Sequence, residues 1–154
     1  MRNFLSQEDI EEMKKEIEFR KVVERKRLIE DVKEARAHGD LSENFEYKAA
    51  KRERGKNESR IRYLERMIKT GKVISTESNE GEVGINNNVK IRFLDDNFEQ
   101  VFNIVTTMKT DAVNSKISIE SPLGKALFKK KVGEIIQVDA PEGSYEVEIL
   151  EVID

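Results

Sequence analysis

Three carboxylates lie close together in one short charged segment of the chain. Asp40, Glu43 and Glu46 follow one another at intervals of three residues, directly after Gly39. Carboxylate oxygens suit a divalent cation, but Mg²⁺ usually keeps several waters and shares its ligands with a phosphate substrate. Two or three carboxylates in one turn are therefore an incomplete metal site, and the remaining ligands would come from another molecule.

The same spacing also has a purely structural interpretation. Asp-x-x-Glu at the start of a helix is typical of a capping box, in which Asp40 would accept hydrogen bonds from backbone N–H groups and Glu43 would reach back. This capping role is compatible with metal binding. The spacing alone leaves both interpretations open.

Other side chains of the turn are ambiguous for different reasons. His38 is the only histidine, so a catalytic dyad or a multi-histidine metal site would need partners that the sequence does not offer, and we interpret it as a solvated turn residue. Leu41 and Phe45 are apolar residues near an exposed turn. They either pack the end of the hairpin or dock on another molecule.

Basic residues follow the carboxylates along the chain. Lys48, Arg52, Lys56 and Arg60 recur every four residues and would form a slowly spiralling stripe on a helix. Such a stripe is either a solvated face with i,i+4 ion pairs or a contact surface for a phosphate backbone beside the acidic turn.

Two helical patterns flank this turn and must position it. The first begins near Ser6 and ends at Gly39; the second begins near Asp40 or Ser42 and ends at Gly71. The expected seam residues of the first helix are Ile10, Met13, Ile17, Leu28, Val32 and Ala35, with a weak stretch from Arg20 to Arg27. Those of the second helix are Tyr47, Ala50, Arg54, Asn57, Ile61, Leu64 and Ile68. About thirty residues at roughly 1.5 Å each give a hairpin arm of about 45 Å.

After Gly71 the apolar period changes from that of a helix to that of a strand. Alternating or short apolar runs predict strands at 89–93, 101–105, 116–119, 135–138 and 145–149. Ser121-Pro122 predicts a short helix, with Ser as N-cap and Pro at the first helical position. We therefore predict an α+β protein: an antiparallel coiled-coil hairpin over residues 1–74, then a small antiparallel sheet domain with one short helix over residues 75–154.

Composition excludes several classes of protein. Residues 1–72 carry 20 Lys and Arg against 16 Asp and Glu, whereas residues 73–154 carry 8 against 15. The net charge of −3 argues against a general duplex-binding protein. The absence of cysteine excludes disulfides and thiolate chemistry. No apolar run approaches a membrane span or a signal-peptide core, so we expect a soluble cytoplasmic protein.

Two segments of this chain resemble the bacterial GreA/GreB transcript-cleavage factors. The first comprises residues 39–47, Gly-Asp-Leu-Ser-Glu-Asn-Phe-Glu-Tyr, with the flanks 33–36 and 49–51, and is similar to the turn signature of that family. The second runs from residues 119–127 through 131–134 and looks like the family's C-terminal signature. The order and separation of both segments agree with the family.

This resemblance implies a coiled-coil finger followed by an FKBP-like domain. In the family, the domain docks on the rim of the secondary channel of bacterial RNA polymerase, and the finger carries its turn to the polymerase active site. The polymerase itself then cuts the extruded nascent RNA of a backtracked complex and creates a new 3′ end. The resemblance therefore implies no enzyme activity of the factor alone, no small-molecule substrate and no membrane partner.

The resemblance also implies residue roles. Asp40 and Glu43 would hold Mg²⁺ jointly with the polymerase active site and orient the attacking water; the free protein would not hold the ion stably. The residues implied to support the turn are Leu41, Ser42, Asn44, Glu46 and Tyr47. The basic residues expected to contact RNA are Arg36, Lys48, Lys51 and Arg52. The residues implied to dock on the polymerase are Glu120, Ser121, Pro122 and Leu123.

The chain departs from the family pattern in two places, and other functions compete. Phe45 stands where alanine is common, and residues 51–58 are more basic and polar than usual. An inhibitory paralogue would occupy the same channel but alters the turn acids, which this chain keeps. A prolyl isomerase would need an aromatic-lined pocket, and this chain has no tryptophan. A structural coiled-coil adaptor would not explain the acidic turn.

Overall fold

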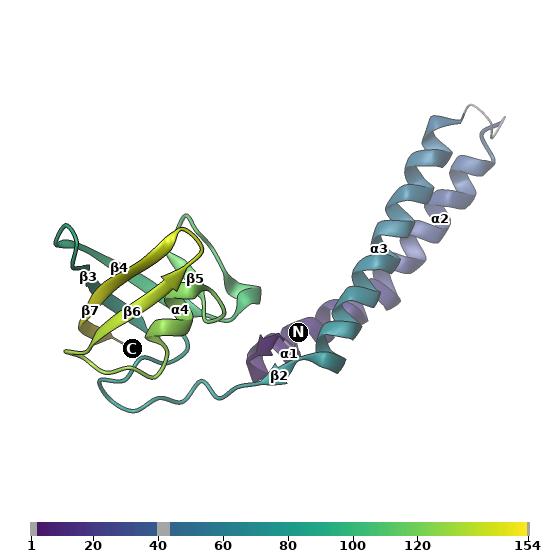
Figure 1. The fold of residues 1–154 in the computed structure, drawn as a ribbon. Helices are drawn as coiled ribbons and strands as arrows, with labels where there is room; N and C mark the ends of the chain where they lie inside the picture. The colour runs from purple at the N-terminus through teal and green to yellow at the C-terminus, as the bar shows by residue number, and fades with distance from the viewer. Residues whose placement is uncertain (1–2, 40–43, 154) are drawn as a thin grey trace. The chain divides into compact units, whose positions relative to one another are not determined.

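The computed structural model describes residues 3–39 and 44–153 (Figure 1). The chain divides into two compact units. Residues 8–71 form a helical hairpin, and residues 72–153 together with residues 3–7 form a sheet domain. The predicted α+β fold class, with an N-terminal hairpin followed by a small sheet domain, is confirmed.

The first arm of the hairpin consists of three consecutive helical segments. They are α1 (Gln7–Phe19), the π-helix η1 (Arg20–Glu24) and α2 (Arg25–Arg36). Five of the six predicted seam residues are buried, and Ile17 is partly buried. The π-helix buries none of its residues, and Phe19, Val22 and Val23 are about half exposed or more. The expected weak stretch of the seam therefore coincides with a change of helix type.

The second arm is the single helix α3 (Phe45–Thr70). It begins later than the predicted start near Asp40 or Ser42, because Asn44 rather than Asp40 provides the N-cap. Its C-cap is Gly71, as predicted, with the Gly71 N–H donating to Met67 O at 2.8 Å.

The predicted seam of the second arm needs two corrections. Asn57, Ile61 and Leu64 are buried as expected. Arg54 is exposed, and Met67 is buried where Ile68 is only half-buried. A small phase error over seven helical turns moves the buried face by one residue, because each residue turns a helix by about 100°.

The sheet domain contains a five-stranded sheet and one short helix. The strand order is β5-β4-β3-β7-β6, and Figure 1 shows α4 beside this sheet. The elements are β3 (Asn88–Phe93), β4 (Phe98–Val105), the 3₁₀ helix η2 (Thr107–Lys109), β5 (Lys116–Ser118), α4 (Pro122–Leu127), β6 (Ile135–Ala140) and β7 (Gly143–Ile153). Strands β3, β4, β6 and β7 pair antiparallel, but β5 is parallel to β4. The sheet is thus mixed rather than wholly antiparallel, because the chain passes through η2 before it returns as β5.

Alternation along the strands builds the core of this domain. Val89 and Ile91 of β3 and Val147 and Ile149 of β7 are fully buried, as side chains two residues apart on one face of a strand should be. Leu127 of α4 completes the same cluster. Its neighbours in the cluster are Val83, Ile85, Ile104, Ile119, Ile136 and Val138.

The N-terminus of the chain contributes to the sheet domain. Strand β1 (Phe4–Leu5) pairs in parallel with β2 (Lys72–Val73), and Phe4 and Ile74 pack against the core cluster. The compact units therefore divide after Gly71, three residues before the predicted boundary, and the sheet domain takes in residues that precede the hairpin. Within the described residues, no helix is both long enough and apolar enough to cross a membrane.

Candidate functional site

The side chain of Asn44 joins the two arms of the hairpin at the turn. Its Oδ1 accepts a hydrogen bond from Tyr47 N at 2.9 Å, and its Nδ2 donates to Ala35 O at 2.7 Å. One amide therefore satisfies an N–H at the start of α3, which has no intrahelical partner, and also binds a carbonyl at the end of α2. This bridge fixes where each arm enters the turn.

Helix α2 ends before the predicted stop at Gly39. Its last residue is Arg36, and Ala37 is its C-cap. The His38 N–H still bonds to Ala35 O at 3.2 Å. Gly39 follows two residues after the cap with a backbone φ of +129°, a conformation that residues other than glycine rarely adopt.

Tyr47 lies against Arg36 across the hairpin. The Arg36 guanidinium carbon is 5.6 Å from the centre of the Tyr47 ring. A hydrogen bond from Arg36, and then the charge of Lys51, hold the pKa of the Tyr47 hydroxyl below its usual range. Arg36 and Tyr47 were predicted for RNA contact and turn support respectively; the structure pairs them with each other.

Glu46 faces His38. The distance from His38 Nδ1 to Glu46 Oε2 is 3.2 Å, and both side chains are exposed. The sequence predicted His38 as solvated and Glu46 as a third carboxylate beside Asp40 and Glu43, but it did not predict this pairing. A single histidine eight residues before a glutamate gives no local periodic signal, so only the hairpin geometry reveals the contact.

The predicted basic stripe divides into two parts. Lys56 lies 3.2 Å from Glu53, and Arg60 lies 2.8 Å from Glu16, so both belong to ion pairs within the hairpin. Lys48, Lys51 and Arg52 are exposed near the turn; the Lys48 Nζ lies 5.6 Å from the centre of the Phe45 ring. Lys56 is also exposed despite its ion pair, whereas Arg60 is only partly exposed; the stripe therefore keeps exposed basic groups from Lys48 to Lys56.

The acidic centre of the predicted site, Asp40 and Glu43 with Leu41 and Ser42, lies outside the described residues. Within residues 3–39 and 44–153, no cluster of three His, Cys, Asp or Glu side chains could hold a metal ion. The described flanks supply basic and aromatic groups and the carboxylate of Glu46, and the metal-holding role of Asp40 and Glu43 stays a prediction.

The second predicted site is a tight corner between β5 and α4. Ser121 Oγ accepts from Gly124 N at 3.1 Å and donates to Ser118 O at 2.6 Å, and Pro122 stands exposed at the first helical position. A Cβ on Gly124 would lie 2.0 Å from Ser118 O. The corner is therefore rigid, and the predicted N-cap is confirmed.

Glu120 is held in place at the same corner. Its carboxylate accepts a hydrogen bond from Thr107 Oγ1, and that hydroxyl also lies 2.7 Å from Ser118 Oγ. Leu123 packs against the core cluster. Of the four predicted docking residues, Glu120 and Pro122 thus present polar and apolar surface, whereas Ser121 and Leu123 anchor the corner.

A network of ion pairs that the sequence analysis missed crosses the middle of the hairpin. Glu16 accepts from both Arg60 and Arg20 at 2.8 and 2.7 Å. These hydrogen bonds, with that from Arg60 the stronger, hold the pKa of Glu16 at about 2 although partial burial acts in the opposite direction. Arg20 Nη1 also donates to Asn57 Oδ1 at 3.0 Å, and Asn57 Nδ2 donates to Arg20 O.

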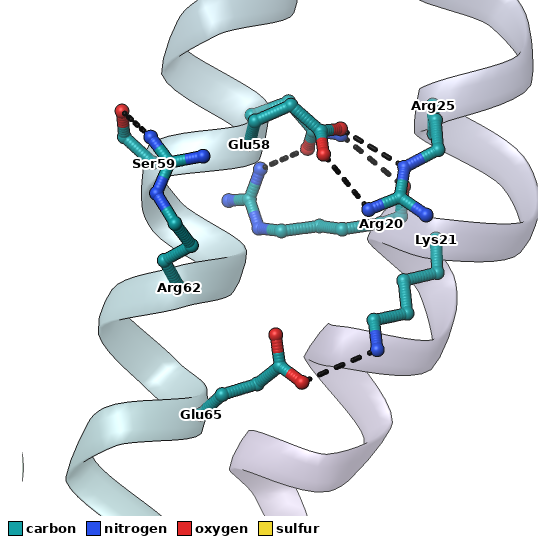
Figure 2. Close-up of polar contacts among 8 residues, drawn as sticks. Arg20, Lys21, Arg25, Glu58, Ser59, Arg62 and Glu65 are labelled. Carbon is teal, nitrogen blue, oxygen red and sulfur yellow. Dashed lines mark hydrogen bonds and ion pairs between the residues drawn. The ribbon is translucent and has the colours of Figure 1, made fainter.

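Further ion pairs extend this network along the arms. Figure 2 shows Arg25 reaching Glu58, which it binds through two hydrogen bonds of 2.9 and 2.8 Å, and Lys21 reaching Glu65. The i,i+4 spacing of Glu16 and Arg20 was the only signal of this network in the sequence. Its cross-helix members follow from the tertiary structure.

Comparison with known proteins covers the whole chain. Residues 3–73 match the family described as "Transcription elongation factor, N-terminal", and residues 71–154 match "Transcription elongation factor, GreA/GreB, C-term". Transcription elongation factor GreA of Caldanaerobacter subterraneus is 45% identical over 149 residues, which are 96% of this chain and 95% of that protein. The protein of the same name from Bartonella henselae is 43% identical over 144 residues, 92% of this chain and 91% of that protein.

Among solved structures, GreA factor homolog 1 of Thermus thermophilus superposes with a TM-score of 0.46 at 22% identity, over 100% of both chains. The two family matches meet at residues 71–73, where the hairpin joins the sheet domain, and together they extend from residue 3 to residue 154. The similarity expected from residues 39–47 and 119–134 is thereby confirmed over both units. This chain belongs to the GreA/GreB family of transcription elongation factors.

Proposed function

We propose that this chain binds bacterial RNA polymerase in the cytoplasm, inserts its hairpin into the secondary channel and stimulates endonucleolytic cleavage of nascent RNA in backtracked complexes. The polymerase active site performs the cleavage, and elongation resumes from the new RNA 3′ end. The observation that carries this proposal is family membership over both units together with Asp40 and Glu43 in the turn of the hairpin.

The hairpin acts as the delivery arm. Asn44 ties the ends of α2 and α3 together, so the two helix ends that flank the acidic segment are held to each other. Basic residues next to the turn, Arg36, Lys48, Lys51 and Arg52, lie where they attract the phosphates of extruded RNA.

The carboxylates of the turn are suitable ligands for Mg²⁺, but they are too few to complete its coordination. Asp40 and Glu43 offer hard carboxylate oxygens, and a six-coordinate Mg²⁺ needs further ligands. We assign those ligands to the polymerase and the RNA, so the site is shared. When bound, the ion stabilises charge on the attacking and leaving oxygens.

The corner between β5 and α4 is the proposed docking surface. Glu120 and Pro122 are held by the hydrogen bonds of Thr107 and Ser121. A rigid surface loses little conformational entropy on binding. Weaker docking of a Glu120→Lys, Pro122→Ala variant should be overcome by excess factor, since this corner does not take part in the chemistry.

The test uses a stalled, backtracked polymerase complex with labelled RNA. The chain should shorten the RNA from its 3′ end, and the product should be re-extended by nucleotides. Asp40→Asn or Glu43→Gln should remove most of the stimulation, while competition against the unaltered chain should show nearly unchanged polymerase binding. Because both acids act on one ion, the double variant should be little worse than either single one.

Two outcomes would contradict the proposal. Binding without cleavage by the unaltered chain would assign it as an inhibitor of the same channel. Normal cleavage by the double variant would remove the metal-holding role of the two acids.

A further inference from the structure

Phe45 exposes an aromatic ring to water directly beside the acidic turn. It is the first residue of α3 and is 79% exposed, compared with 51% for Phe19 and 55% for Phe98. Burying a phenylalanine side chain contributes roughly 1.5–3 kcal/mol of favourable free energy, and the free hairpin does not gain this contribution. The ring is therefore available to a partner.

Among the described residues, the group that lies over the ring is a cation. Lys48, one turn along the same helix, places its Nζ 5.6 Å from the ring centre, as side chains three residues apart on a helix should lie. An ammonium group covers one face of a ring, and the 79% exposure leaves the opposite face open. Glu46 and Tyr47 instead contact His38 and Arg36 of the first arm.

This combination distinguishes between two kinds of partner. An apolar protein pocket that enclosed Phe45 would also have to desolvate the Lys48 ammonium, which is costly without a counter-charge. Single-stranded RNA supplies both complements, because its bases stack on aromatic rings and its phosphates pair with cations. Stacking on the open face also leaves Lys48 in water at the edge of the contact.

We propose that Phe45 is a stacking platform for one extruded nucleobase of the backtracked RNA, and that Lys48 pairs with a neighbouring phosphate. This inference rests on the proposed function. It adds a base-holding contact that positions the RNA strand next to Asp40 and Glu43. The contact tolerates any base sequence, because every base has a π face.

The test is a double-mutant cycle between the ring and the base. Complexes backtracked by about three nucleotides are prepared with natural RNA and with RNA in which one extruded nucleotide at a time is abasic. Single-turnover cleavage at saturating factor is compared for the unaltered chain, Phe45→Leu and Phe45→Trp. Leu keeps apolar bulk without a π face, and Trp keeps the π face.

Stacking on a base is worth roughly 1–3 kcal/mol, so Phe45→Leu should slow cleavage of natural RNA at least about fivefold. The same substitution should have little effect when the stacked nucleotide is abasic, and Phe45→Trp should cleave natural RNA about as well as the unaltered chain. The abasic position that abolishes the difference identifies the stacked base.

Each other outcome overturns the inference. If Phe45→Leu slows cleavage equally on natural and abasic RNA, the ring contacts protein or supports the turn. If the Phe45→Leu variant stimulates cleavage of natural RNA at the normal rate, the Phe45 ring does not hold a base. In both cases the unaltered chain still stimulates cleavage, whereas failure of the proposed function would abolish stimulation by every form of the chain.

Discussion

The sheet domain and the hairpin are held together by different interactions. The apolar core of the sheet domain includes Val89, Ile91, Leu127 and Ile149, which are all fully buried. The hairpin has an apolar seam at each end, but ion pairs and Asn57 occupy its middle. The comparison shows that the sheet and its helix build a continuous apolar cluster, whereas the apolar seam of the hairpin, with Ile61 and Leu64 buried, is interrupted by polar side chains.

Among the described residues, the buried polar side chains of the sheet domain are the uncharged Ser6, Asn87 and Thr106, whereas those of the hairpin are Asp9 and Asn57. A buried charge is expensive unless it is paired and hydrogen-bonded, whereas a pair that stays partly in water costs little and gains little. Glu16, Arg20 and Arg25 of the hairpin retain about a third of their side-chain exposure. Their ion pairs determine which residues of the two arms face each other. These pairs contribute less to the free energy of unfolding than an apolar seam would.

The largest expected effect is in the sheet domain. Leu127→Ala removes a fully buried side chain and should lower the free energy of unfolding by about 2–5 kcal/mol, since the core cannot collapse fully into the cavity. Chemical denaturation measures this loss. The control is Val101→Ala, at a 44% exposed position of strand β4 in the same domain. It should change the free energy of unfolding by at most about 0.5 kcal/mol. Equal effects would contradict the assignment of the core.

The next effect tests the buried amide of the hairpin. Asn57→Ala removes both hydrogen bonds to Arg20, and should cost about 1–3 kcal/mol because buried polar groups lose their partner. Thermal unfolding followed by helical ellipticity measures it. Arg54→Ala, three residues earlier on the exposed face, should have little effect. If the free energy of unfolding is unchanged by Asn57→Ala, water replaces the hydrogen bonds of the amide without loss of stability.

A pH titration should separate the two units further. The pKa of Glu16 is lowered from 4.5 to about 2, so its ion pairs stabilise the hairpin above about pH 5, and this contribution is lost as the pH falls towards 2. After allowance for solvent screening the contribution should be about 1–2 kcal/mol. Glu16→Gln should lower hairpin stability at neutral pH and flatten its dependence below pH 5. An unchanged pH profile would contradict the shifted pKa.

The smallest effect is expected for the outer ion pair. Arg25 binds Glu58 through two hydrogen bonds, but both side chains are about one-third exposed. A double-mutant cycle with Arg25→Gln and Glu58→Gln should give a coupling of about 0–1 kcal/mol that decreases with added salt. The single-contact pair of Lys21 and Glu65 should give less. A coupling well above this range would mean that the hairpin excludes water better than its exposed side chains indicate.

Much of the fold could be predicted because its signals are local. The 3–4 apolar spacing located both arms, the alternation located five strands, and Ser121-Pro122 located helix α4. Strands β1 and β2 were missed because two residues each are too short to show a period. The start of α3 was placed too early because Asp40 and Asn44 are both good N-caps, and only the contact between Asn44 and Ala35 O favours the second.

By itself, the sequence determined the two units, the acidic pair Asp40 and Glu43 and the family to which they point. Only the tertiary structure decided which distant residues meet: Arg20 with Asn57 across 37 residues and Glu16 with Arg60 across 44. The reason is physical. The periodicity of apolar residues shows which face of each segment is buried. The pairing of residues depends instead on the register between segments, and that register is fixed only when their side chains pack.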